Sequence, residues 1–189
     1  TKETAIDVQL SLDGGVVGDD DKYVIDTGIV PLDIFVSTLA KEANVSLNVV
    51  CKGDLWVDDH HTSEDVSIAI GQVLNKALGT KAGLNRMWCA LGEEGEAQVE
   101  VTMDLSNRPC LTSNLSLSTN TNKSEYIDND DTNSLSIEMF AHALESLVMN
   151  GQMTVHIVEK RVGKNLMETV VATAIAFGRA LRLCAAVDP

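Results

Sequence analysis

The sequence predicts an α+β fold of two ββαβα half-domains, whose helices pack between two antiparallel or mixed sheets. Two observations lead to this prediction. The same order of strand and helix patterns occurs twice along the chain, and residues of the two copies match at a fixed offset. We place the first half-domain at residues 1–93 and the second at 94–189. Because each sheet needs one face covered, the two halves would share one core and form a single structural domain.

In the first half, alternating apolar and polar residues predict strands, and apolar residues at a spacing of three or four predict helices. The predicted strands cover residues 6–12, 23–29 and 45–49, and the predicted helices cover residues 31–43 and 62–78. A turn at Asp13–Gly15 would join the first two strands as a hairpin. Thr62 or Ser63 is expected to cap the second helix, which ends at Gly79.

The second half repeats this order. The predicted strands lie at residues 99–105, 115–117 and 153–157, the predicted helices lie at residues 135–149 and 168–186, and an exposed polar loop is expected at residues 120–134. A shift of 107 residues pairs Ala69 with Ala176 and Gly71 with Gly178. Small residues at matching helix positions predict close helix packing in both halves, and internal duplication explains the match better than chance does.

Composition narrows the classes of function. The net charge is −14 and basic residues form no stripe, which argues against nucleic-acid binding and against adhesion to an anionic membrane. No apolar run reaches the ~18 residues of a membrane span. The polar N-terminus predicts no signal peptide. The four widely separated cysteines predict reduced thiols rather than a cysteine–zinc site.

The densest polar motif covers residues 58–65, at the start of the second predicted helix. His60 and Glu64 are four residues apart, so they share one helix face, and His61 follows directly. Imidazole and carboxylate groups together suit a divalent metal, and the neighbouring aspartates could orient the rings. A solvated acidic helix start is the alternative interpretation, since negative charge is favourable there.

Further strings follow in order along the chain. They include Thr1-Lys2-Glu3-Thr4, Thr27-Gly28-Ile29, Gly53-Asp54-Leu55, Asp58-Asp59-His60-His61-Thr62-Ser63-Glu64-Asp65, Asp104-Leu105-Ser106-Asn107-Arg108-Pro109, His156-Ile157 and Gly163-Lys164-Asn165. Over nearly the whole chain they resemble the imidazoleglycerol-phosphate dehydratase family, the manganese lyase of histidine biosynthesis. The resemblance implies a duplicated fold, a manganese cofactor, and trimers assembled into a hollow homo-oligomeric cage with metal sites between subunits.

The resemblance also implies roles for individual residues. It places metal ligands at His60, His61, Glu64 and His156, phosphate contacts at Arg86 and Arg108, and a weak catalytic candidate at Glu3. Other family positions have lost their polar group or their histidine, and here they hold Ile34, Trp56, Met167, Glu168 and Val171. About half of the family's metal ligands are therefore missing. We expect Trp56 to fill the former pocket and His142 to be an ordinary packing residue.

The main functional hypothesis is a catalytically degenerate member of this family. It would serve as a structural, scaffold or regulatory subunit of a cage, made of its own copies or shared with an intact paralogous subunit. The alternative is an active manganese-dependent dehydratase with an altered site. A third possibility is a small-molecule binding module that uses Arg86 and Arg108 without turnover. Either manganese or no cofactor is expected, with no nucleic-acid or membrane partner, in the cytoplasm or the plastid stroma.

Overall fold

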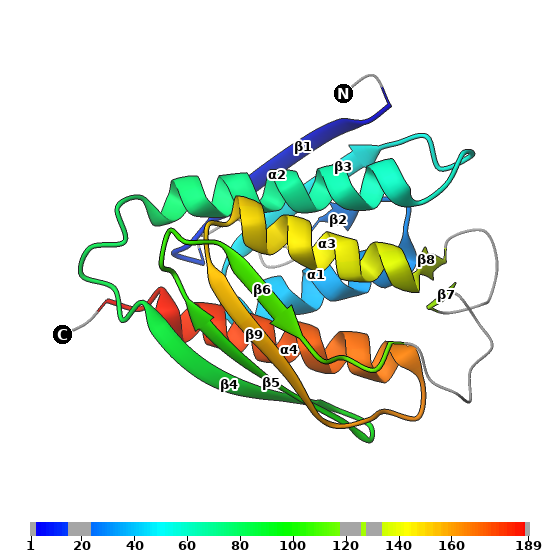
Figure 1. The fold of residues 1–189 in the computed structure, drawn as a ribbon. Coiled ribbons are helices and arrows are strands. Elements are labelled where there is room, and N and C mark those ends of the chain that lie inside the picture. Colours follow the sequence, from blue (N-terminus) through cyan, green and yellow to red (C-terminus); the bar gives the residue numbers. More distant parts are fainter. Residues whose placement is uncertain (1–2, 15–23, 118–125, 128–133, 188–189) are drawn as a thin grey trace.

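A three-stranded and a four-stranded sheet enclose four helices in the described part of this protein, for which we use a computed structural model (Figure 1). The structure describes residues 3–14, 24–117, 126–127 and 134–187. The first sheet contains β1 (Ala5–Ser11), β2 (Ile25–Asp26) and β3 (Ser46–Lys52). The second sheet contains β4 (Met87–Glu94), β5 (Ala97–Asp104), β6 (Cys110–Ser113) and β9 (Thr154–Arg161). The helices are α1 (Val30–Ala43), α2 (His60–Leu78), α3 (Ile137–Asn150) and α4 (Leu166–Cys184).

The helices form the layer between the sheets. α2 packs on β1 and against α3, while α4 packs on β4 and β5 and against α1. Figure 1 shows β1 and β3 of the first sheet behind α2, and β4, β5 and β9 of the second sheet in front of α4. The predicted α+β class, with helices between two sheets, is confirmed.

The two sheets have the same strand pairing. β1 pairs antiparallel and β2 parallel with β3, and β5 pairs antiparallel and β6 parallel with β9. In both sheets a helix, α1 or α3, separates the parallel strand from its partner in sequence. β4 adds an edge strand to the second sheet only, among the described residues. This topology agrees with the predicted duplication. The boundary at residue 93, which falls within β4, stays a prediction.

Several predicted strands differ from the observed ones. Because β3 lies between β1 and β2, the predicted hairpin of the first two strands is wrong. In the second half the short strand is β6, which ends before the predicted residues 115–117. The sequence pattern does not predict β4 as a strand, because its side chains are mostly exposed on a sheet edge and apolar residues do not alternate along it. The predicted exposed loop at 120–134 contains β7 (Tyr126–Ile127), which pairs with β8 (Leu135–Ser136) just after the loop. Ile127 is buried, contrary to the prediction of an exposed loop. Residues 120–125 and 128–133 lie outside the described ranges.

The start of α2 also differs from the prediction. The helix begins at His60 rather than at Thr62 or Ser63, because the Asp58 carboxylate accepts the His60 amide at 3.0 Å. Thr62 is instead fully buried, while Ser63 donates its hydroxyl to the Asp59 carbonyl. The helix ends at Gly79, as predicted.

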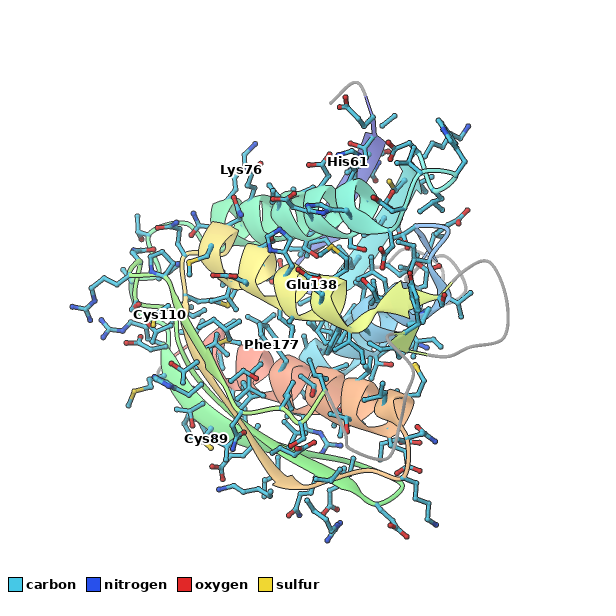
Figure 2. All side chains as sticks on the ribbon, turned by 45° about the vertical axis from the view of Figure 1, so that its right-hand side comes forward. His61, Lys76, Cys89, Cys110, Glu138 and Phe177 are labelled. Carbon is cyan, nitrogen blue, oxygen red and sulfur yellow. The ribbon has the colours of Figure 1, made fainter. Side chains whose placement is uncertain are left out.

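The cysteines are free thiols, as expected from their wide separation in the sequence, and the core is built mainly from aliphatic residues. All four cysteines are free, with Cys51 and Cys184 buried and Cys89 and Cys110 exposed on the second sheet (Figure 2). Burial raises the pKa of Cys51 to about 11 and that of Cys184 to about 12. The core is largely aliphatic, with one edge-to-face contact between Phe35 and Phe140 at 5.3 Å. Among the described residues, no helix is long and apolar enough to cross a membrane.

Two glycines permit the close helix packing that the sequence predicts. A Cβ added at Gly71 of α2 would lie 2.8 Å from the Leu147 carbonyl oxygen of α3, and one at Gly178 of α4 would lie 2.5 Å from the Leu39 carbonyl oxygen of α1. Both distances are shorter than real carbon–oxygen contacts, and both neighbours are backbone atoms that cannot rotate away. The α2–α3 and α1–α4 pairs therefore depend on the missing side chain.

Replacing either glycine by alanine is expected to destabilise the protein. In an unobstructed helix, Gly→Ala stabilises by roughly 1 kcal/mol, whereas overpacking costs about 1–3 kcal/mol. Urea denaturation of Gly71→Ala and Gly178→Ala should therefore show a lower free energy of unfolding than wild type. An increase in either variant would contradict the proposed close contact.

Candidate metal centre

The first turn of α2 is anchored to the start of α3. The Asp59 carboxylate accepts the backbone amide of Ser136 at 2.6 Å. Ser136 in turn caps α3, because its hydroxyl accepts the Met139 amide. The two helices therefore begin at a common point and run side by side, as Figure 2 shows for the segments that carry His61 and Glu138.

Glu64 lies between two histidines. Its Oε2 is 3.4 Å from Nε2 of His60, one turn away on α2, and its Oε1 is 3.3 Å from Nε2 of His142 on α3. The His60 and His142 rings lie 5.6 Å apart between centroids. The shared face of His60 and Glu64 is thus confirmed, whereas the expectation that His142 is an ordinary packing residue is wrong. A histidine within an otherwise apolar helix is the sequence feature that could have indicated a polar role for His142.

The donor chemistry of this cluster fits a divalent metal. One ligand atom from each of His60, Glu64 and His142 lies within 4.8 Å of the others. Two imidazoles and one carboxylate are ligands that manganese, iron and zinc accept. A cavity of about 530 Å³ opens beside the cluster, and Glu138, Glu145 and Ser113 contribute to its wall.

His61 is oriented by a different carboxylate. Its Nδ1 lies 3.0 Å from Oδ2 of Asp54, and this hydrogen bond raises the pKa of His61. The other oxygen of Asp54 is buried and has no protein partner among the described residues. A carboxylate on one ring nitrogen is the usual way to direct the second nitrogen toward a metal. The contact between Asp54 and Nδ1 of His61 therefore suits His61 for a role as a metal ligand through Nε2.

The remaining predicted site residues lie elsewhere. His156 is exposed on β9 between the buried Val155 and Ile157, so it points away from the helix layer, and it is not in the three-residue cluster. Glu3 is exposed just before β1. The structure therefore does not gather all of the predicted metal ligands within one chain.

Arg86 and Arg108 lie at the other end of α2. Arg86 has a positive φ of 68° and pairs with Asp104 at 3.0 Å, and its carbonyl accepts the Leu105 amide. Arg108 is exposed in the turn before β6. α2 has 19 residues and so extends about 28 Å from His60 to the loop that leads to Arg86 (Figure 1). Within one chain, Arg86 and Arg108 are therefore distant from His60 and His61.

The substituted family positions have local structural roles. Ile34 is half-buried on α1, and Met167 and Val171 are half-buried on α4. Trp56 is 85% exposed, so the expectation that it fills a pocket is wrong. Glu168 accepts the backbone amides of Lys164 at 2.9 Å and Glu96 at 3.0 Å, which lowers its pKa. Its carboxylate thus joins the β4–β5 turn to the start of α4.

Comparison with known proteins is consistent over the whole chain. A family model described as imidazoleglycerol-phosphate dehydratase matches residues 4–181. The chain is 38% identical over 189 residues to the chloroplastic imidazoleglycerol-phosphate dehydratase of Pisum sativum, with 100% of this chain and 62% of that protein covered. It is 36% identical to the imidazoleglycerol-phosphate dehydratase of Prochlorococcus marinus (strain NATL1A), with 100% and 85% covered.

A solved structure agrees with these matches. The crystal structure of imidazoleglycerol-phosphate dehydratase from Staphylococcus aureus subsp. aureus N315 aligns with a TM-score of 0.79 at 27% identity, covering 97% of this chain and 94% of that one. The chain spans less than two thirds of the length of the plant relatives from Pisum sativum and Arabidopsis thaliana. The family resemblance inferred from the sequence is confirmed.

Removing the Glu168 carboxylate is expected to destabilise the protein at neutral pH. The lowered pKa means that this stabilisation is present above the ordinary value of 4.5 and is lost as pH falls through the lowered pKa. Urea denaturation should therefore show a lower free energy of unfolding for Glu168→Ala at pH 7, and the difference from wild type should shrink at acid pH. Glu94→Ala, at an exposed position of the same hairpin, is the control. An equal loss in both variants would refute the assigned contact.

Proposed function

The chain belongs to the imidazoleglycerol-phosphate dehydratase family, and from that premise we propose that it acts in the dehydration of imidazoleglycerol phosphate, a lyase reaction of histidine biosynthesis. The observation that carries the proposal is the intact motif at the start of α2, where His60 lies beside Glu64 and His61 beside Asp54. The relatives from Pisum sativum and Prochlorococcus marinus both bear the name of the enzyme, which favours the active alternative over the purely structural hypothesis.

The proposed cofactor is manganese, which imidazole and carboxylate ligands suit. A divalent ion would supply charge stabilisation to the substrate imidazole as the hydroxyl leaves. The residues of this chain would orient the ligands: Asp54 directs the His61 ring, and the first helical turn places His60 beside Glu64. Arg108, at an exposed turn, would bind the substrate phosphate through its planar guanidinium, with Arg86 nearby in the fold.

A complete site would form between subunits. Within one chain the arginines and the histidines lie at opposite ends of α2, so neither end alone offers both metal and phosphate contacts. We therefore propose a homo-oligomer built from trimers. In that homo-oligomer the second half-site would lack donors, because Met167 and Val171 offer no imidazole or carboxylate and Glu168 is bound to backbone amides. An intact paralogous subunit in a mixed assembly would supply the missing ligands. The proposed location is the cytoplasm or the plastid stroma.

The same three positions favour a second candidate function. A cage subunit that stabilises or regulates an assembly without turnover would need the fold and the contact surfaces but no complete ligand set. The loss of donors at Met167 and Val171, and the structural use of Glu168, are the observations for this candidate. Activity measurements separate it from the enzymatic proposal.

The activity prediction compares the chain alone with a mixed assembly. The chain is co-expressed with an intact family member from the same source and purified by a tag on this chain. We expect dehydration of imidazoleglycerol phosphate and bound manganese in the mixed assembly, and a much lower rate from the pure chain. His60→Ala with His61→Ala in this chain should lower both the rate and the metal content. Unchanged values, or no co-purifying partner, would leave the structural candidate. Rapid turnover by the pure chain that a chelator abolishes would show that this chain suffices.

The assembly prediction concerns size. The proposed trimer-based oligomer should give a molar mass at least three times that of one chain in light scattering at micromolar concentration. A mass near 20.3 kDa would contradict it. Repeating the measurement after chelation tests whether metal contributes to assembly.

A further inference from the structure

We propose that His60 and Glu64 of α2 and His142 of α3 form a transition-metal site within a single chain. The inference rests on the proposed function in one respect only, the use of a divalent metal by the motif at the start of α2. Its new element is His142, a residue to which the family resemblance assigns no ligand role. The site needs no residue from a neighbouring subunit.

The spacing of the donor atoms suits one ion. At metal–nitrogen and metal–oxygen distances near 2.0–2.1 Å, tetrahedral ligand atoms lie about 3.4 Å apart. The Glu64 carboxylate already has separations of 3.4 Å from His60 Nε2 and 3.3 Å from His142 Nε2. All three donors lie within 4.8 Å of one another. Small side-chain rotations would therefore bring the donors around an ion without moving either helix.

The helices that carry the ligands are held together independently of any ion. Asp59 accepts the Ser136 amide at the start of both helices, and Gly71 allows the close contact with α3 further along α2. This pairing places Glu64 against His142 through backbone geometry rather than through mobile loops. Ligands on rigid elements lose little freedom on binding, which favours metal affinity.

The coordination sphere would remain open on one side. The three side chains are half-exposed, and the adjoining cavity of about 530 Å³ reaches His60 and His142. Three protein ligands with an accessible fourth position are typical of catalytic rather than structural zinc-type sites. Zn²⁺, Co²⁺ and Mn²⁺ are the ions with suitable ligand preferences. In the competing arrangement the carboxylate bridges the two histidines without a metal; it predicts no saturable binding, and titration distinguishes the two.

Cobalt binding tests the site directly. Co²⁺ is titrated into the metal-free full chain and followed by its visible absorption and by calorimetry. We expect saturable binding, with affinity reduced at least about 10-fold in His142→Ala and in Glu64→Gln. His142→Asn is a second variant that keeps a polar side chain, and circular dichroism verifies that each variant is folded. Glu145→Gln removes a carboxylate from the same cavity wall and should bind Co²⁺ as wild type does.

His156→Ala distinguishes the two possible ligand sets. His156 is retained at a family ligand position but lies outside the cluster, so its removal should leave this Co²⁺ affinity unchanged. Loss of binding in His156→Ala with normal binding in His142→Ala would overturn the single-chain site, while leaving the proposed dehydratase function intact. Absence of saturable Co²⁺ binding in wild type would also overturn it. The proposed function is judged separately, by turnover in the mixed assembly.

Discussion

The close approach of the helices in the layer between the two sheets determines the rest of this structure. Gly71 and Gly178 permit backbone contact between α2 and α3 and between α4 and α1, where any side chain would collide with a carbonyl oxygen. The same approach on the α2–α3 side sets the distance at which Glu64 contacts His142. Helix packing and the chemistry of the candidate site are therefore consequences of one spacing.

The polar residues are divided between the two ends of that layer. The histidines and their carboxylates cluster where α2 and α3 begin, whereas Arg86 lies beside Asp104 beyond the far end of α2. His156 lies on the outer face of the second sheet. The proposed substrate, with an imidazole at one end and a phosphate at the other, is small compared with this separation, so the proposed contacts to both parts call for residues of more than one chain.

Periodicity predicted most of the fold, because α1, α2 and α3 each bury one face, β5 alternates buried with half-buried residues, and β1 alternates half-buried with exposed residues. It failed for β4, an exposed edge strand, and for the pairing of β2, which depends on contacts distant in sequence. For the site, the four-residue spacing predicted that His60 meets Glu64. The approach of His142 could not be predicted from spacing along one helix, since it depends on how α3 packs against α2. The expected burial of Trp56 was wrong, because replacing a polar residue by tryptophan does not itself create a pocket that buries the ring.

The contacts of Glu168 restrict which residues this position can hold. Its carboxylate joins the β4–β5 turn to the start of α4 through two backbone amides, so the residue now serves the scaffold. A change of Glu168 to histidine would remove that bond before any neighbouring ligand position regained a donor. Such a change would thus cost stability, and with Met167 and Val171 in place it would still leave the neighbouring positions without donors. The two backbone hydrogen bonds therefore favour glutamate over histidine at this position on stability grounds alone.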